Sequence, residues 1–269
     1  MRWIRLSKEV VLRFLLFSIR FPLVLLWLIS CLVCVALVYP FVSIGVRNAM
    51  NHHWSRALMF LCGVKLRVMG EPTLQGSALW VANHVSWIDI YVLSSVRCVA
   101  FIAKSEIRDW PVIGWLVAKV GTIFVNRSQR NSVRKVGADM QKLFDQDMVI
   151  GLFAEGTTSR GFDVLPFHTS LFEPPVRAGI KIQPVALRFF HKGQRSDYLA
   201  FVGNESLIHN LWVLLGTTGA MVEVQFIPPV PAEQYEGGRA QVADYVREHI
   251  REAVVQGLAQ GHEAQPLAA

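Results

Sequence analysis

The stretch ALWVANHVSWID, residues 78–89, decides the fold, because it joins a short apolar run to a polar turn and the start of a helix. Ala78–Ala82 is apolar throughout and has the length of a strand, which is typical of a strand buried on both faces of a sheet. A polar turn follows at Asn83, and Ser86–Val96 has the pattern of a helix. A buried strand that leads directly into a helix is the repeating unit of an α/β sheet.

The same alternation of short apolar runs and helical segments continues along the chain. The predicted strands are Ala78–Ala82, Cys98–Ala103, Thr122–Val125, Met148–Phe153, Ile182–Leu187, Tyr198–Val202 and Met221–Ile227. The predicted helices are Ser86–Val96, Ile107–Val120, Ser128–Phe144 and Gly238–Gln256. This pattern predicts an α/β fold, with a mixed sheet flanked by helices.

The positive charge of the chain is concentrated near its N-terminus. The net charge is +7, yet residues 1–70 hold nine basic residues and one acid, whereas the remainder holds 18 basic and 19 acidic residues. Basic residues around an apolar run favour contact with anionic lipid headgroups. A nucleic-acid-binding protein would carry its basic patch on the folded domain, so the distribution argues against a nucleic-acid partner.

An apolar segment lies within this basic region. Phe21–Val46 contains no charged residue and, as a helix, would be about 39 Å long, more than a bilayer core of about 30 Å requires. Pro40 interrupts the segment, so it is either one tilted transmembrane helix or two shorter helices that enter one leaflet. We therefore expect a helical membrane anchor in residues 1–70, an α/β domain in 71–260 and a flexible tail in 261–269.

The four cysteines exclude a disulfide scaffold, since they are too few for a chain of this length. Cys31 and Cys34 form a C-x-x-C pattern inside the apolar segment, with no histidine or second cysteine pair near them. We therefore predict no metal site and no cofactor.

His84 and Asp89 are the candidate catalytic residues, and their spacing has two interpretations. Ser86 and Asp89 have the spacing of a capping box, in which case His84 is an ordinary loop histidine. Alternatively, the first helical turn brings Asp89 back to His84. A carboxylate on one ring nitrogen then leaves the other nitrogen free to accept a proton.

Three further stretches accompany this element, each at or beside a predicted strand. They read GTIFVNR at residues 121–127, FAEGTTSRG at 153–161 and IQPVAL at 182–187. Together with NHVSWID at 83–89, these four blocks in this order resemble the lysophospholipid acyltransferase family, whose best-known members are 1-acyl-glycerol-3-phosphate acyltransferases. The resemblance runs from about Ala78 to Leu187.

This resemblance implies a role for each candidate residue. His84 would be the general base that deprotonates the acceptor hydroxyl, and Asp89 would orient it, with no covalent enzyme intermediate. The acyl donor would be acyl-carrier protein or acyl-CoA carrying a fatty acyl thioester. The pocket for the polar head of the acceptor would be formed by Lys104, Arg127, Glu155, Gly156, Thr157 and Arg160, with Pro184 shaping its wall. We expect Glu155 to order its loop or to pair with a base.

Structural interpretations of these residues remain open. Arg127 would then only cap a strand or pair with an acid, Gly156 would only serve a turn, and Lys104 would be a solvated lysine. An apolar groove for the acyl chain is also implied. The residues that either line it or belong to the core are Phe101, Trp110, Ile113, Trp115 and Leu116.

Some positions depart from the family pattern, mostly by loss of positive charge. Ala154 and Thr158 stand where proline and arginine are usual, with Arg160 two places further on. Asn126 replaces a common aspartate, and His168 replaces a frequent lysine or arginine. Fewer cations near the expected phosphate make lyso-ornithine lipid, or another lyso-lipid, an alternative acceptor to lysophosphatidate.

We therefore predict a membrane-anchored O-acyltransferase on the cytoplasmic face of the inner membrane, where acyl thioesters are available. Its expected partners are a lysophospholipid, an acyl donor and membrane lipid, and its expected product is phosphatidic acid. The competing hypothesis of another class is a non-catalytic membrane lipid-binding protein, which predicts that His84 and Asp89 lie apart. A hydrolase is disfavoured, because no serine or cysteine nucleophile is evident.

Overall fold

The centre of the molecule is an eight-stranded mixed sheet. The structure, a computed structural model, describes residues 2–125 and 132–259. The strand order is β1-β8-β6-β2-β5-β3-β4, with β7 paired to the outer end of β6. The strands are β1 (Val64–Met69), β2 (Ala78–Ala82), β3 (Val99–Lys104), β4 (Ile123–Val125), β5 (Val149–Leu152), β6 (Lys181–His191), β7 (Gln194–Arg195) and β8 (Ala220–Phe226).

Strand direction determines where the chain leaves the sheet. Strands β6, β2, β5, β3 and β4 are mutually parallel, whereas β8 pairs with β6 in the antiparallel sense and with β1 in the parallel sense. The carboxyl ends of the five parallel strands therefore meet at one edge of the sheet. The predicted mixed α/β sheet is confirmed.

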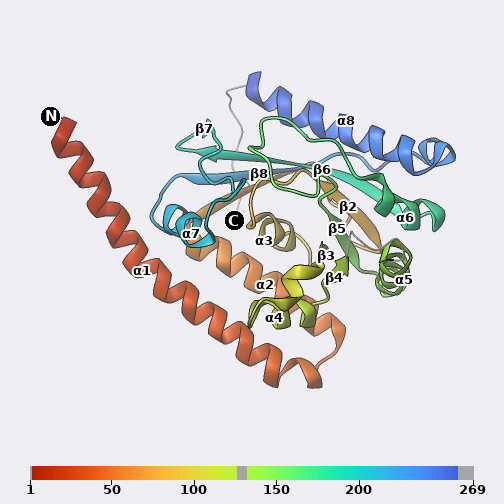
Figure 1. Ribbon diagram of the computed structural model, residues 1–269, viewed down its shortest axis with the longest axis horizontal. Coiled ribbons are helices and arrows are strands. Elements are labelled where there is room, and N and C mark those ends of the chain that lie inside the picture. Colours follow the sequence, from red (N-terminus) through yellow and green to blue (C-terminus); the bar gives the residue numbers. More distant parts are fainter. Residues whose placement is uncertain (1, 126–131, 260–269) are drawn as a thin grey trace.

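Helices cover both faces of this sheet, as Figure 1 shows. One face carries α1 (Arg2–Leu37), α2 (Ile44–Cys62), α3 (Asp89–Ser94), α4 (Ile113–Lys119) and α7 (Leu207–Leu215). The opposite face carries α5 (Ser132–Phe144), α6 (Glu173–Arg177) and α8 (Gly238–Ala259). The sheet is thus the middle of three layers.

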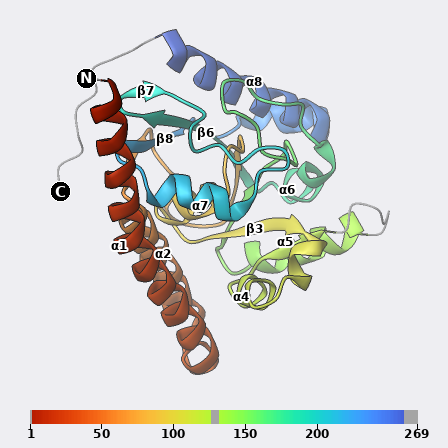
Figure 2. The ribbon, with the colours of Figure 1, turned by 60° about the vertical axis from the view of Figure 1, so that its left-hand side comes forward.

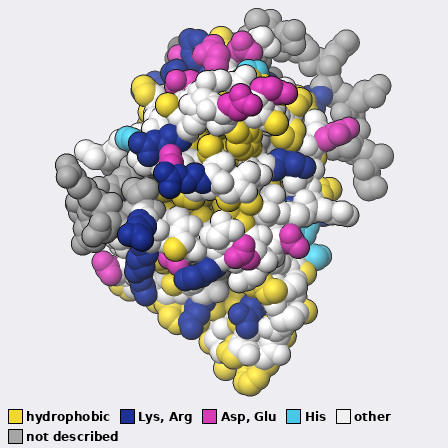
Figure 3. Space-filling view, turned by 90° about the vertical axis from the view of Figure 1, so that its right-hand side faces the viewer, with side chains coloured by type: hydrophobic (Ala, Val, Ile, Leu, Met, Phe, Trp, Pro, Cys, Tyr) yellow, Lys and Arg dark blue, Asp and Glu magenta, His cyan; other side chains and the backbone are white. Residues whose placement is uncertain are grey.

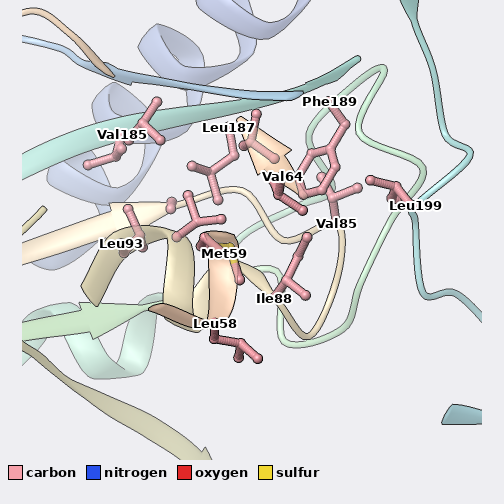
Figure 4. Close-up of a cluster of buried hydrophobic side chains, with 14 of the residues drawn as sticks. Leu58, Met59, Val64, Val85, Ile88, Leu93, Val185, Leu187, Phe189 and Leu199 are labelled. Carbon is pink, nitrogen blue, oxygen red and sulfur yellow. The ribbon is translucent and has the colours of Figure 1, made fainter. Parts of the chain in front are cut away.

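Strand β2 contributes to the hydrophobic cores on both faces. Trp80 and Ala82 pack into the cluster under α2 and α3, and Leu79 and Val81 pack into the cluster under α5 and α8. All four are fully buried. Figure 4 shows part of the first cluster, in which side chains of α2 meet those around α3 and along β6. Burial on both faces explains why β2 contains no polar residue.

Two local predictions need correction, and the start of a third lies outside the described residues. The predicted helix Ile107–Val120 is divided into a 3-10 helix, η2 (Ser105–Asp109), and α4, because Pro111 lacks the N–H that a continuous helix needs. The predicted strand Tyr198–Val202 is wrong: it forms a loop in which the N–H of Phe201 donates to the carbonyl of Val85 over 2.9 Å. The predicted helix from Ser128 is described only from Ser132 onward, as α5.

Besides 3-10 helices, four elements of the α/β domain were not predicted: strands β1 and β7 and helices α6 and α7. Strand β1, Val64–Met69, pairs with β8 over its whole length, although the sequence analysis placed these residues in the N-terminal segment. Arg67 of β1 is paired with Glu223 of β8 at 3.1 Å, so part of the N-terminal basic charge belongs to the sheet.

The apolar N-terminal segment forms a helical hairpin. Helix α1 ends at Leu37, a turn that contains Pro40 reverses the chain, and α2 returns along α1 (Figures 1 and 2). The indole N–H of Trp27 donates to the carbonyl of Trp54 over 3.1 Å, which ties the two helices together. Within the described residues, one helical segment, Lys8–Leu37, is long and apolar enough to cross a membrane, and only 11% of its most apolar window is buried.

The first half of α1 is attached to the α/β domain. Arg13 donates to the hydroxyl of Tyr198 over 2.7 Å, and Arg20 donates to the carbonyl of Thr217 over 2.6 Å. Figure 2 shows this half of α1 beside α7, while the α1–α2 turn extends beyond the sheet. Apolar side chains on both sides of the turn are exposed, among them Leu37 and Phe41, whereas Tyr39 within the turn is buried.

Candidate active site

The predicted site residues come from the carboxyl ends of neighbouring parallel strands. His84 follows β2, Glu155 follows β5, and Lys104 is the last residue of β3. Open α/β sheets place their ligand sites at this edge, where the loops converge. Arg127 and Asn126, which follow β4, lie outside the described residues.

His84 and Asp89 are in direct contact. Nδ1 of His84 lies 2.7 Å from Oδ2 of Asp89, whose side chain is fully buried, whereas 19% of the His84 side chain is exposed. A buried carboxylate is an acceptor, so Nδ1 carries the proton and Nε2 has a free lone pair. Among the described residues, Nε2 has no hydrogen-bond partner.

The backbone of the same turn holds the carboxylate in place. Oδ2 of Asp89 also accepts from the N–H groups of Val85 at 2.7 Å and Ser86 at 3.0 Å. The capping-box interpretation holds only in part: Asp89 accepts from the N–H of Ser86, but α3 begins at Asp89 and the buried Ser86 Oγ has no partner in the described part of the chain. One carboxylate oxygen therefore accepts from the backbone of the turn and from the His84 ring at the same time.

Glu155 connects the loop after β5 to the backbone of His84. Its side chain is buried; Oε1 accepts from the N–H of His84 at 2.7 Å, and Oε2 accepts from the N–H of Leu165 at 2.9 Å. Burial raises the pKa of Glu155, and the two hydrogen bonds oppose this rise. Glu155 thus connects the turn after β2 with the loop that follows β5.

The rest of this loop also contacts the backbone near His84. The N–H of Ser159 donates to the carbonyl of His84 over 2.7 Å. Gly161 has a φ of +76°, and a Cβ at this position would lie 2.7 Å from a methyl group of Val85. Gly156, with a φ of +72°, forms the turn directly after Glu155. Both glycines are thus required by the backbone of the loop.

Of the remaining predicted binding residues, three are exposed near the sheet edge and one is buried inside the sheet. Thr157 and Arg160 are exposed on the loop after Glu155, and Arg160 lies 3.3 Å from the Asp197 carboxylate. Lys104 is exposed at its strand end. Pro184 is buried in the middle of β6, opposite Val81 of β2, and therefore lies deeper in the sheet than His84.

An aromatic column on His84 was not predicted from the sequence. The ring of Phe153 stacks on His84 with centroids 4.0 Å apart and planes at 11°, and its other neighbour is Phe101, at 5.5 Å and 7°. Phe153 ends the predicted strand Met148–Phe153, but the stack depends on β5 lying between β2 and β3. The residue spacing alone contains no signal for it.

An apolar cavity begins beyond this column. It lies between the hairpin, α3, β3 and α4, and its lining includes Trp27, Cys31, Tyr91, Phe101 and Leu116. Burial raises the pKa of Tyr91 to about 12, consistent with its apolar surroundings. Of the residues predicted for an acyl groove, Phe101 and Leu116 line this cavity.

The other groove predictions are not supported by the described cavity. Ile113 is not among its lining residues, and Trp110 and Trp115 are exposed on the outer side of the η2–α4 segment. The described residues contain no group of three or more His, Cys, Asp or Glu side chains arranged to hold a metal ion.

Comparison with known proteins decides the family. A sequence model named Acyltransferase matches residues 65–188, which include His84, Asp89 and Glu155. A lyso-ornithine lipid O-acyltransferase of Pseudomonas aeruginosa is 32% identical over 209 residues, which cover 78% of this chain and 80% of the relative. The chain belongs to the lysophospholipid acyltransferase family.

Other relatives of this acyltransferase are named for a different acceptor, 1-acyl-sn-glycerol-3-phosphate. A 1-acyl-sn-glycerol-3-phosphate acyltransferase of Neisseria gonorrhoeae is 32% identical over 183 residues, which cover 68% of this chain and 71% of the relative. The crystal structure of a 1-acyl-sn-glycerophosphate acyltransferase from Thermotoga maritima superposes with a TM-score of 0.66 at 19% identity, and covers 97% of this chain and 99% of the other. The latter likeness shows the shared fold.

Membership of this family makes the protein an acyltransferase with lysophospholipid acyltransferase activity. The non-catalytic hypothesis required His84 and Asp89 to lie apart, whereas they are hydrogen-bonded.

Proposed function

We propose that this acyltransferase transfers a fatty acyl group from acyl-carrier protein or acyl-CoA to the free hydroxyl of 1-acyl-sn-glycerol-3-phosphate, giving phosphatidic acid. One observation carries the proposal: a fully buried carboxylate holds a partly exposed imidazole whose second nitrogen is free. This arrangement suits the removal of a proton from a bound hydroxyl.

The reaction is a direct transfer. Nε2 of His84 accepts the proton as the acceptor oxygen attacks the thioester carbonyl carbon, so a C–O bond forms. The C–S bond then breaks, and the departing thiolate takes the proton from the imidazolium. Asp89 stabilises the imidazolium while it exists. No enzyme side chain becomes acylated in this scheme.

The acyl chain of the donor occupies the apolar cavity. The cavity reaches Phe101, which is separated from His84 only by the ring of Phe153. An apolar chain in this cavity gains hydrophobic stabilisation and places its thioester end near the base. Chain length would then be limited by the hairpin side chains Trp27 and Cys31 at the other side of the cavity.

Polar groups at the rim hold the acceptor head. We assign this role to Lys104 and Arg160, to Arg127, which follows β4, and to the backbone N–H of Thr157, since such groups bind anions. The N–H of Gly156 donates to the carbonyl of Phe153 over 3.1 Å, so Gly156 contributes by shaping the turn. Glu155 and Pro184 act through the loop and the sheet rather than by contact with the phosphate.

A second candidate acceptor is lyso-ornithine lipid, and one observation favours it. Arg160 is paired with Asp197, so this part of the rim offers a positive and a negative group side by side. A zwitterionic head group, with a carboxylate and an ammonium, matches such a pair better than a phosphate does. The relative named for lyso-ornithine lipid and the relative named for 1-acyl-sn-glycerol-3-phosphate are each 32% identical to this chain.

The hairpin provides the membrane anchor. Because Arg13 and Arg20 tie the first half of α1 to the α/β domain, we propose that the α1–α2 turn enters one leaflet of the inner membrane from the cytoplasmic side. Membrane lipid thereby supplies the acceptor, and the cytoplasm supplies the donor.

The test is an acceptor panel with two donors. The full-length protein in detergent is assayed with lysophosphatidate and lyso-ornithine lipid, each with acyl-carrier-protein and coenzyme A thioesters of the same chain. The proposal predicts the highest kcat/KM with lysophosphatidate; a higher value with lyso-ornithine lipid selects the second candidate. Transfer to neither acceptor by a folded protein would refute both.

A further inference from the structure

The segment formed by η2 and α4 is apolar on two opposite sides. Its inner side chains Ile107, Leu116 and Val120 line the apolar cavity. Its outer side exposes Trp110 by 52%, Val112 by 54% and Trp115 by 41%. We call these last three side chains the outer α4 surface.

The backbone holds this surface in a defined position. Val112 has a φ of +64°, which is unfavourable for a β-branched residue and is maintained only where the surroundings impose it. Gly114 is packed so tightly on η2 that a Cβ there would lie 2.1 Å from the carbonyl oxygen of Arg108. The apolar side chains are therefore displayed by a fixed turn.

A short helix that is apolar on both sides needs an apolar environment on both sides. The cavity satisfies the inner side, but water would meet two indole rings and a valine on the outer side. Tryptophan is enriched at the boundary between lipid headgroups and acyl chains, because its ring is apolar and its N–H is polar.

The outer α4 surface lies beside the hairpin. Helix α1 contacts α4, and Trp27 and Cys31 of α1 share the cavity with Leu116 of α4. In Figure 1, α4 lies next to the α1–α2 turn, and Figure 3 shows hydrophobic side chains at the same lower end, with Lys and Arg side chains above them. The two exposed apolar regions therefore adjoin one another.

The charges around the surface agree with an anionic lipid partner. Residues 104–119 contain three cations, Lys104, Arg108 and Lys119, and two acids, Glu106 and Asp109. All five are exposed. Exposed cations beside an apolar and aromatic surface are typical of segments that lie in the membrane interface.

We propose that the outer α4 surface is a second lipid-docking site, which rests at the headgroup boundary of the leaflet that the hairpin enters. This inference rests on the proposed function for its membrane setting. The η2–α4 segment then contacts the acyl cavity with its inner side chains and lipid with the outer α4 surface, so it separates the cavity from the bilayer.

The experiment places a fluorescent probe at single sites. Cys34 and Cys98, the two partly exposed cysteines, are replaced by alanine, and a cysteine is introduced in turn by Trp110→Cys, Trp115→Cys or Leu165→Cys. Leu165 is the matched control, because it is 40% exposed and its carbonyl accepts from Arg247 of α8, on the opposite face of the sheet. The full chains are reconstituted into phosphatidylethanolamine–phosphatidylglycerol vesicles with or without brominated acyl chains.

Probes at 110 and 115 should be quenched by brominated lipid several-fold more strongly than the probe at 165, and should become shielded from aqueous iodide. Equal quenching at the three positions would overturn the proposal. Shielding from iodide without quenching by brominated lipid would also overturn it, since it would indicate a protein partner or a second copy. The same measurement on His84→Ala, which removes the proposed base, should give the wild-type pattern, so a failure of the docking site is distinguishable from a failure of the proposed function.

Discussion

Asp89→Asn separates the two tasks of the Asp89 carboxylate, its negative charge and its fixed acceptor oxygen. Oδ2 accepts three hydrogen bonds, from Nδ1 of His84 and from the N–H groups of Val85 and Ser86. An asparagine side chain must place its oxygen at the position of Oδ2, because an NH2 group there would be a donor facing three other donors. The amide oxygen then still accepts from Nδ1, so Nε2 of His84 keeps its free lone pair.

The expected loss in rate follows from the charge alone. A hydrogen bond to a charged group contributes about 1.5–3 kcal/mol, which corresponds to a fall in kcat of about 10- to 150-fold when the imidazolium loses that partner. A wrong tautomer would cost more, about 10⁴-fold, as when asparagine replaces the aspartate of a serine-protease triad. We therefore expect the smaller loss here. Asp89→Ala should lose more, because the ring also loses its orientation.

Stability provides the control for this variant. The asparagine NH2 would take the place of Oδ1, which is buried and has no partner among the described residues. An unsatisfied buried donor costs about 1–3 kcal/mol in the free energy of unfolding, so the protein should fold but melt earlier.

The assay is the initial rate of acyl transfer in detergent micelles at saturating donor, for the wild type, Asp89→Asn, Asp89→Ala and His84→Ala. Undiminished turnover in Asp89→Asn would show that the carboxylate has no catalytic role. An Asn variant as slow as His84→Ala, yet correctly folded, would refute the claim that the backbone donors fix the amide oxygen.

Three further predictions concern the surroundings of the base. Phe153→Leu should lower kcat with little change in KM, because the His84 ring loses its stacked neighbour; Phe153→Tyr should restore the rate, and a loss confined to KM would contradict this role. Burial raises the pKa of Glu155 above its ordinary value of 4.5, so the folded protein keeps a proton there that the unfolded chain has lost, and the contribution of Glu155 to the free energy of unfolding falls as pH rises from 4.5 toward the raised pKa. The excess stability of the wild type over Glu155→Gln in urea unfolding should therefore shrink over that range; an excess that grows with pH would show the opposite shift. Leu116→Trp should narrow the cavity and lower kcat/KM for long-chain donors more than for short-chain donors, whereas equal effects would place the acyl chain elsewhere.

The contact between His84 and Asp89 was predictable from sequence because it is local. His84 and Asp89 are five positions apart across one turn, and an apolar strand before that turn fixes its place at a sheet edge. Strand β2 was equally clear, since its burial on both faces removes every polar residue. These features depend on few contacts from distant parts of the chain.

Features that depend on strand order were not predictable. The stack of Phe153 on His84 and Phe101 exists because β5 lies between β2 and β3. Strand β1 alternates basic and apolar residues and lies at the edge of the sheet, so it lacks the apolar run of an inner strand. The basic charge of Arg67 is explained only by its partner Glu223, which lies on β8.

The cavity likewise depends on tertiary packing. Trp110, Trp115 and Leu116 are neighbours in a segment that the sequence treats as one helix. Pro111 and the positive φ of Val112 separate Trp110 from α4. Within α4, Trp115 and Leu116 are consecutive residues, so the helix turns them to different sides: Leu116 lines the cavity and Trp115 is exposed. The direction in which each of these side chains points could not be inferred from the sequence.

The proposed role of His84 as the base of a direct acyl transfer is tested by following a labelled acyl group. Purified wild type and His84→Ala are compared in micelles with a radiolabelled acyl thioester and lysophosphatidate, and both the lipid product and the protein are counted for label. We expect a fall in turnover of about 10²–10⁴-fold in the variant, with no label bound covalently to either protein. Unchanged turnover in a folded His84→Ala, or label bound covalently to the wild type during turnover, would contradict it.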